Sequence, residues 1–85
     1  MASIEIYTQP FCPYCARALL LLDQKQAAYR EIHAPSGSPE RAEAKLRSGG
    51  STSVPQIFID GTAIGGCDDL MALERAGKLD RLLAA

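Results

Sequence analysis

Two cysteines separated by two residues, Cys12 and Cys15, constrain the fold of this chain more than any other feature. The residues before them are β-branched and aromatic, which favours a strand, and the residues after them are rich in alanine and leucine, which favours a helix. Pro13 suits the first position of a helix because its missing N–H costs nothing there. The sequence therefore predicts a strand, a turn and a helix that begins at the cysteine pair.

This placement of the two cysteines suits thiol–disulfide exchange. A thiolate is the attacking species, and a free cysteine thiol with a pKa of about 8.5 is mostly protonated at neutral pH. Unpaired N–H groups and aligned peptide dipoles at a helix N-terminus favour a sulfur anion at Cys12. Cys15 lies one turn later on the same side, where it can reach that sulfur and is more buried. We expect Cys12 to be the nucleophile and Cys15 the resolving cysteine.

The same cysteine spacing occurs in tetrahedral zinc sites. Two more ligands would be needed, and the sequence offers only Cys67 and His33, each alone rather than in a second pair. Redox chemistry without a metal is therefore the favoured interpretation. We interpret Cys67 as a small buried residue with an inert side chain and His33 as a surface residue.

The composition is that of an ordinary folded domain. The 85 residues are 47% hydrophobic and 22% charged, with a net charge of -1 and scattered basic residues, which argues against a nucleic-acid partner. The leucine run at 19–22 is much shorter than a membrane span, and the N-terminus lacks the pattern of a signal peptide. Three cysteines do not suit a secreted disulfide framework. We expect one domain over residues 1–85 in the cytoplasm, with no membrane partner.

Hydrophobic periodicity and turn residues predict an α/β chain with the order β-α-β-α-β-β-α and a short terminal helix. Asp60 and Gly61 predict a hairpin turn, and Asp68 or Asp69 is expected to cap the third helix. The expected strands are residues 4–8, 28–32, 55–59 and 62–64, and the expected helices are residues 13–26, 41–46 (capped by Ser38), 70–75 and 79–83. A right-handed crossover makes the first two strands parallel. We interpret Lys25, Arg41 and Glu43 as solvated charges worth little individually.

Three segments in this order, residues 4–15, 53–61 and 64–70, closely resemble the dithiol glutaredoxins. The likeness covers essentially the whole chain. It implies a thioredoxin-like fold, with a four-stranded mixed sheet flanked by helices, and glutathione-dependent reduction of disulfides. Glutathione would be the reducing co-substrate, and the partners would be protein disulfides or glutathionylated proteins, ribonucleotide reductase being typical of the family. We expect a monomer.

The resemblance also implies where glutathione binds. Val54 and Pro55 resemble the cis-proline element of the family, in which the residue before proline pairs with the cysteinyl backbone of glutathione. Gly66 allows close approach of the chain, and the N–H groups of Cys67 and Asp68 resemble the clamp for the γ-glutamyl group. The other residues implied in glutathione contact are Gln9, Tyr14, Ser53 and Arg47.

One position departs from the family pattern. Many glutaredoxins carry a lysine where this chain has Gln9, and that lysine helps to bind the glycine carboxylate of glutathione. A neutral amide forms a hydrogen bond roughly half as strong as a charge-assisted one. Arg47 is the remaining candidate for that carboxylate. We expect amides at the helix terminus, rather than a neighbouring cation, to favour the thiolate of Cys12.

Two other functions remain open on the sequence. The chain could be a dithiol carrier that a flavoprotein reductase recharges, and the absence of lysine at Gln9 keeps this alternative open. It could instead hold an iron–sulfur cluster between two protomers, with Cys12 and glutathione as ligands. Pro13 disfavours the cluster because it stiffens the turn and removes a backbone N–H near the sulfur.

Overall fold

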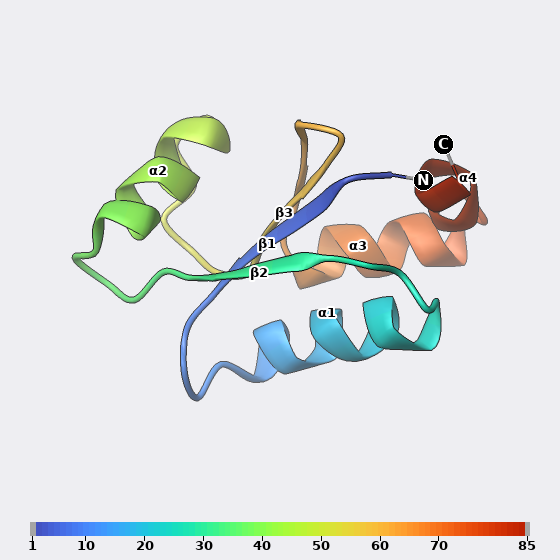
Figure 1. Ribbon diagram of the computed structural model, residues 1–85, viewed down its shortest axis with the longest axis horizontal. Coiled ribbons are helices and arrows are strands. Elements are labelled where there is room, and N and C mark those ends of the chain that lie inside the picture. Colours follow the sequence, from blue (N-terminus) through green and yellow to red (C-terminus); the bar gives the residue numbers. More distant parts are fainter. Residues whose placement is uncertain (1, 85) are drawn as a thin grey trace.

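A four-stranded mixed sheet with the strand order β2-β1-β3-β4 organises the chain (Figure 1). The computed structural model describes residues 2–84. Its elements are β1 (Ile4–Thr8), α1 (Pro13–Gln24), β2 (Arg30–His33), α2 (Pro39–Arg47), β3 (Gln56–Ile59), β4 (Thr62–Gly65), α3 (Cys67–Arg75) and α4 (Leu79–Ala84). β1 pairs in parallel with β2 and antiparallel with β3, and β3 pairs antiparallel with β4. The predicted fold class and element order are confirmed.

The element boundaries differ from the predicted ones where backbone hydrogen bonds extend a turn or a helix. β2 begins at Arg30 instead of residue 28 because the N–H of Ala27 still bonds the carbonyl oxygen of Leu22, at 3.0 Å, in the turn after α1. α2 begins at Pro39, directly after Ser38, whose Oγ accepts the N–H of Arg41 at 3.1 Å as a helix cap does. Ser38 is thus the predicted cap.

The start of α3 differs from the prediction in its capping residue. Gly66, and neither Asp68 nor Asp69, is the N-cap. The carboxylate of Asp69 reaches back and accepts the N–H of Gly66 at 2.9 Å. This contact is the half of a capping box in which an acidic residue at the third helical position satisfies the N-cap amide. Asp69 therefore stabilises the helix start from inside the helix.

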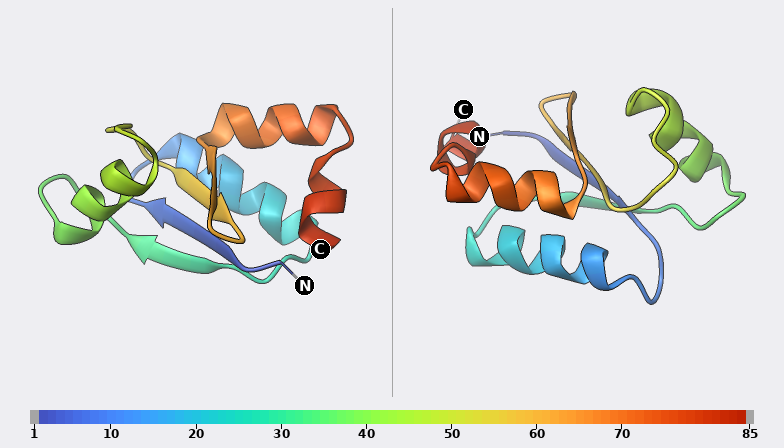
Figure 2. Two further views of the ribbon diagram at one scale, coloured as in Figure 1. Left: turned by 90° about the horizontal axis from the view of Figure 1, so that it is seen from above. Right: turned by 180° about the vertical axis from the view of Figure 1, so that it is seen from behind.

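Alternate residues of the strands divide the core between the two faces of the sheet. Isoleucines of β1 and β3 face α1 and α3, which lie side by side (Figure 2). On the opposite face Tyr7 and Phe58 pack beneath α2, with ring centroids 5.6 Å apart in an edge-to-face arrangement. The larger cluster comprises Ile4, Ile6, Ala18, Leu21, Leu22, Ile57, Ile59, Cys67, Leu70 and Leu79, and the smaller comprises Tyr7, Ala34, Ala44 and Phe58.

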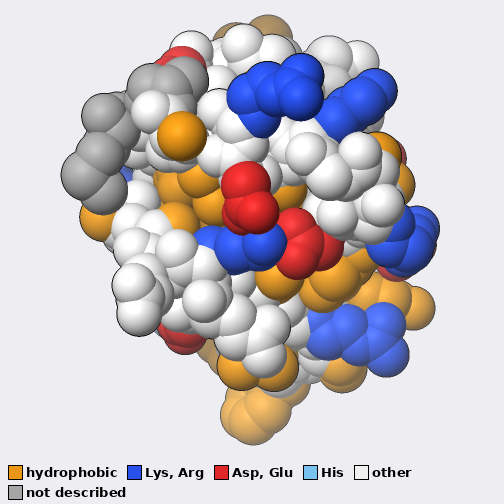
Figure 3. All heavy atoms as spheres, turned by 90° about the vertical axis from the view of Figure 1, so that its right-hand side faces the viewer, with side chains coloured by type: hydrophobic (Ala, Val, Ile, Leu, Met, Phe, Trp, Pro, Cys, Tyr) orange, Lys and Arg blue, Asp and Glu red, His pale blue; other side chains and the backbone are white. Residues whose placement is uncertain are grey.

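Lys25 forms ion pairs with two other helices and is not the solvated charge that the sequence suggested. Its Nζ lies 2.8 Å from a carboxylate oxygen of Glu74 on α3 and 2.8 Å from one of Asp80 on α4. Figure 3 shows this end of the molecule, where basic and acidic side chains adjoin over hydrophobic ones. The pairs hold the last turn of α1 against the C-terminal helices.

Candidate active site

Cys12 occupies the N-cap of α1, as predicted from its place before Pro13. Its Sγ accepts the N–H of Cys15 at 3.1 Å and lies 3.8 Å from the carbonyl oxygen of Val54, to which the thiol donates. Phe11, the preceding residue, adopts a positive φ of 58° and exposes its whole side chain. This turn leaves Cys12 half-buried at the surface.

Cys15 is the buried sulfur of the pair, with 3% of its surface exposed. Burial raises the pKa of the Cys15 thiol to about 12, and the hydrogen bond with Cys12 and the charge of Glu31 act in the same direction. Cys15 is therefore a neutral thiol at physiological pH. The structure thus separates an accessible sulfur from a buried, protonated one.

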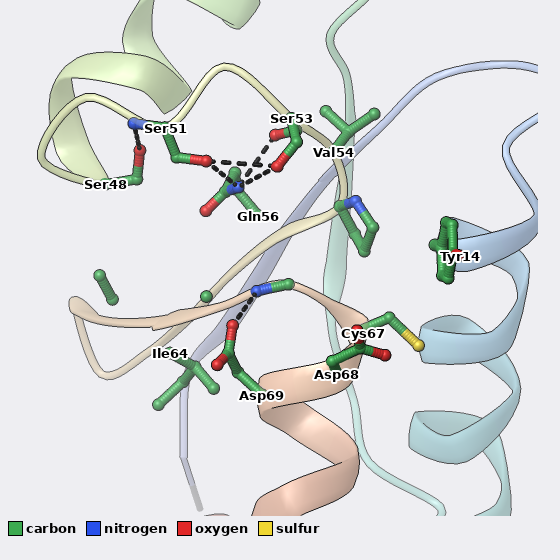
Figure 4. Close-up of a pocket in the computed structure, with 14 residues that line it drawn as sticks. Tyr14, Ser48, Ser51, Ser53, Val54, Gln56, Ile64, Cys67, Asp68 and Asp69 are labelled. Atoms are coloured by element: carbon green, nitrogen blue, oxygen red, sulfur yellow. Dashed lines mark hydrogen bonds between the residues drawn. The ribbon is translucent and has the colours of Figure 1, made fainter.

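A groove with a volume of about 560 Å³ ends at the N-terminus of α3 (Figure 4). It adjoins Cys12, because the carbonyl oxygen of Val54, which lines the groove, lies 3.8 Å from the Cys12 sulfur. Figure 4 shows Ser53 and Val54 on one wall and Cys67 and Asp68 on the other. The peptide bond between Val54 and Pro55 is cis, as the family resemblance implied. The lining residues are Tyr14, Ser48, Ser51, Ser53, Val54, Pro55, Gln56 and residues 63–69.

Backbone donors in this groove are open to a ligand. Among residues 2–84 no group accepts the N–H of Val54, Cys67 or Asp68. The first turn of a helix leaves such N–H groups unpaired and carries partial positive charge. The groove therefore offers an extended-chain pairing position at Val54 and an anion-binding position at the start of α3.

The side chain of Cys67 belongs to the core, as predicted. It is 3% exposed and packs in the larger hydrophobic cluster, and its sulfur points toward α1 in Figure 4. Burial and the negative charge of Asp68 raise the pKa of the Cys67 thiol. Only the backbone of Cys67 is thus available to the groove.

The side chain of Arg41 forms hydrogen bonds with three other residues, whereas the sequence predicted a solvated charge. Its guanidinium donates to Oε1 of Gln9 at 2.8 Å and to the carbonyl oxygens of Ala34 and Thr52, both at 2.9 Å. These acceptors come from three segments that are distant in sequence, so no local pattern points to Arg41. The contact puts a positive charge directly beside Gln9, where the family usually has lysine.

Arg47 does not reach the groove, so the interpretation of Arg47 as a carboxylate ligand is corrected. Its guanidinium lies 2.8 Å from a carboxylate oxygen of Glu5 and 2.8 Å from the hydroxyl of Tyr7, and 4.1 Å above the centroid of Phe58. The Tyr7 hydroxyl donates to the Glu43 carboxylate at 2.7 Å, and Glu43 itself is exposed, as predicted. The contacts of Arg47 therefore stabilise the packing of α2 on the sheet.

We expect Arg47→Ala to destabilise the fold by about 2 kcal/mol, because it leaves Glu5 and Tyr7 without their partner. The hydrogen bond from Arg47 lowers the pKa of Glu5 below 4.5, so this stabilisation is present above pH 4.5 and is lost as the pH falls below it. Urea unfolding of both proteins at pH 7 and pH 3 measures the effect. An equal difference at both pH values, or weaker glutathione binding by the folded variant, would contradict this assignment.

The predicted site residues separate into three groups. Tyr14, Ser53, Val54, Pro55, Gly66, Cys67 and Asp68 line the groove, Gln9 lines a separate cavity together with Cys12, and Arg47, the last residue of α2, contacts Glu5 and Tyr7 of β1. His33 is exposed, as predicted. Within residues 2–84 no three His, Cys, Asp or Glu side chains are grouped closely enough to hold a metal ion. In the same part of the chain no helix has the length and hydropathy needed to span a membrane.

Comparison with known proteins decides the family. The sequence model described as Glutaredoxin matches residues 4–64. The chain belongs to the glutaredoxin family. This glutaredoxin is 55% identical to a glutaredoxin of Pseudomonas aeruginosa over all 85 residues of both chains. It is 52% identical to glutaredoxin 3 of Escherichia coli K12 over 83 residues, which are 98% of this chain and 99% of that one.

A solved structure supports the same assignment. The buckwheat glutaredoxin–glutathione complex matches this glutaredoxin with a TM-score of 0.85 and 34% identity, over 95% of this chain and 76% of that one. Glutaredoxins are thiol–disulfide oxidoreductases, and so is this family member. The predicted family and thioredoxin-like fold are confirmed.

Proposed function

We propose that this glutaredoxin uses glutathione to reduce protein disulfides and glutathione mixed disulfides. It acts as a monomer in the cytoplasm and as one domain over residues 1–85, of which Met1 and Ala85 lie outside the described residues. One observation carries the proposal: the groove beside Cys12 joins the unpaired N–H of Val54 to the open N-terminus of α3. Those features match the extended backbone and the terminal carboxylate of a tripeptide thiol.

The γ-glutamyl end of glutathione would bind at α3. Its carboxylate accepts the N–H groups of Cys67 and Asp68, and its amino group pairs with the Asp68 side chain. The cysteinyl backbone pairs with Val54, which directs the glutathione sulfur to Cys12. Tyr14, Ser53, Pro55 and Gly66 complete the walls of the groove. The buckwheat relative, whose structure is a glutathione complex, supports this ligand.

Gln9 and Arg41 together would take the place of the family lysine at the glycine end. Arg41 supplies the positive charge, and the amide oxygen of Gln9 holds the guanidinium at 2.8 Å. The amide nitrogen of Gln9 donates to no residue among 2–84 and is free to bond the glycine carboxylate. Arg41 rather than Arg47 is therefore our candidate for charge recognition at this end.

A single sulfur suffices for glutathione mixed disulfides. The Cys12 thiolate attacks the glutathione sulfur of a glutathionylated protein, the S–S bond breaks, and the protein leaves as a thiolate that takes a proton from solvent. A second glutathione thiolate then attacks the Cys12-bound glutathione, which releases oxidised glutathione and restores the Cys12 thiolate. Cys15 takes no part in this route.

Protein disulfides need both sulfurs. Cys12 attacks one sulfur of the substrate and forms a mixed disulfide, and Cys15 then attacks Cys12. The reduced protein leaves, the Cys12–Cys15 bond forms, and two glutathione molecules reduce that bond in turn. Reduction potentials of glutaredoxins, roughly −200 to −230 mV, allow cytosolic glutathione to drive this cycle.

A coupled assay tests the proposed function. NADPH, glutathione reductase and glutathione are mixed with a small glutathione mixed disulfide, and NADPH oxidation is followed with and without the protein. We expect turnover that requires glutathione. Turnover that instead requires a flavoprotein thioredoxin reductase, and is indifferent to glutathione, would favour the rival dithiol carrier.

We expect Gln9→Ala to change the alkylation rate of Cys12 by less than about twofold at pH 7, because the α1 terminus supplies most of the stabilisation of the thiolate. Stopped-flow alkylation with iodoacetamide, with Cys15 replaced by serine in both proteins, measures this rate. The same variant should bind glutathione more weakly. A loss of alkylation rate of tenfold or more would assign the activation of the sulfur to the Gln9–Arg41 pair.

A further inference from the structure

A second cavity adjoins the cysteine pair and shares no lining residue with the glutathione groove. It has a volume of about 440 Å³ and is lined by Thr8, Gln9, Phe11, Cys12, Pro13, Cys15, Ala16, Leu19 and Glu31. Both cysteines reach it, and Glu31 is the only acidic residue among the described residues that line it. Of the residues that line this cavity, the proposed binding of glutathione uses Cys12 and Gln9 but neither Cys15 nor Glu31.

Strand register directs Glu31 toward the cysteines. Glu31 on β2 pairs with Ile6 on β1, and Ile6 packs in the core between the sheet and α1. Glu31 therefore lies on the α1 face of the sheet. The hydroxyl of Thr8, which is 2% exposed, donates to a carboxylate oxygen of Glu31 at 2.7 Å and fixes its orientation. His33 on β2 and Tyr29, which directly precedes the strand, are its titratable neighbours, and the His33 imidazole lies 3.9 Å away.

The resolving step needs a proton acceptor at this place. Cys15 must lose its proton to attack, yet it is 3% exposed and its pKa is raised to about 12. At neutral pH very few such thiols ionise unaided, so removal of the proton limits the step. The side of Cys15 that meets the second cavity offers a route for the proton, because the cavity has room for water and the side chains of Thr8, Gln9 and Glu31 can hydrogen-bond to it.

We propose that Glu31 accepts the proton of Cys15 through a water molecule when Cys15 attacks the mixed disulfide on Cys12. The Cys15 sulfur forms a bond to the Cys12 sulfur, the bond between Cys12 and the substrate breaks, and its electron pair leaves on the substrate thiolate. The proton passes to the Glu31 carboxylate, whose side chain is 37% exposed, and then to solvent. Glu31 is a positioning residue that acts through water, and the inference rests on the proposed dithiol route.

An aromatic disulfide isolates this step without glutathione. Reduced protein is mixed with 5,5′-dithiobis(2-nitrobenzoate) in a stopped-flow instrument: attack by Cys12 releases one coloured thiolate, and attack by Cys15 on the mixed disulfide releases a second. The Cys15→Ser variant identifies the second phase by its loss. Failure of the first release would contradict the proposed function, whereas the second release tests Glu31 alone.

We expect Glu31→Gln to slow the second release by about tenfold or more and to leave the first unchanged. Glu40→Gln, which neutralises an exposed carboxylate on α2, serves as the matched control. Glu31→Asp should restore part of the rate, and so should formate added to Glu31→Gln. Equal second phases in Glu31→Gln and the unmodified protein, or equal slowing of both phases, would overturn the proposal.

The pH profile gives a readout that a purely structural role of Glu31 would not change. If a fixed side chain rather than hydroxide accepts the proton, the second release of the unmodified protein should be nearly independent of pH between pH 6 and pH 8. In Glu31→Gln hydroxide must remove the proton, and the rate should rise about tenfold per pH unit. A tenfold rise per unit in the unmodified protein would overturn the proposal even if the variant failed to fold.

Discussion

Cys12→Ser is expected to abolish the reduction of both substrate classes, whereas Cys15→Ser abolishes only the reduction of protein disulfides. Loss of an enzyme nucleophile removes essentially all covalent catalysis, so a fall of about a thousandfold or more is expected for Cys12→Ser. Cys15 is buried and protonated beside a sulfur that is more accessible, and it has no function until a mixed disulfide forms on Cys12. The coupled glutathione assay and insulin disulfide reduction measure the two routes.

A matched control for these variants is Cys67→Ser, since its buried thiol stands outside the proposed chemistry. This control should retain both activities and lose only stability. Equal inactivity of the Cys12 and Cys15 variants on a glutathionylated substrate would show that the roles of the two sulfurs are wrongly assigned. Retention of protein disulfide reduction by Cys15→Ser would remove the dithiol route and leave the single-sulfur route alone.

Gly65→Ala is expected to be the most destabilising glycine substitution, at about 3 kcal/mol. Gly65 has a φ of +113°, and a Cβ there would overlap the Asp69 carboxylate, with Cγ at 2.7 Å. That carboxylate accepts the N–H of Gly66, so the substitution also disrupts the start of α3. Urea unfolding measures the loss of stability, and the same variant should bind glutathione weakly.

Gly61→Ala is the matched control because Gly61 also has a positive φ, +80°, but faces open space in the hairpin turn. Gly61→Ala should therefore lose only about 1 kcal/mol of folding free energy, the cost of holding alanine at a positive φ. Similar losses in the two variants would mean that the contact between Gly65 and Asp69 contributes nothing. A stable Gly65→Ala protein with unchanged glutathione affinity would contradict the capping role of Asp69.

The sheet could be predicted from the sequence because its signals are local. Isoleucines alternate with polar or aromatic residues in β1, and Asp60 and Gly61 mark the hairpin turn, so two strands and one connection follow from neighbouring residues alone. The start of α1 follows from Cys12 and Pro13 in the same way. The wrong cap of α3 arose because aspartate is favoured at the N-cap, although an acidic third residue after glycine also signals a capping box.

The polar contacts around the site could not be predicted because their partners are distant in sequence. Arg41 and Arg47 lie on one helix and carry the same charge, yet one reaches Gln9 and the other reaches Glu5. The rotation of α2 on the sheet decides which arginine reaches Gln9, and no sequence pattern encodes that rotation. The resemblance to a family identified the position that needs a cation, but not the side chain that supplies it.

The two cores differ in size, so the helices that carry the active site have more buried support than α2 has. α1 and α3 rest on the larger cluster, whereas α2 is held by four buried residues and the polar contacts of Arg47. Segments with little buried apolar surface open before the rest of a protein unfolds. We therefore expect Cys12 on α1 and the proposed γ-glutamyl clamp on α3 to keep their positions when α2, with Arg41, opens locally.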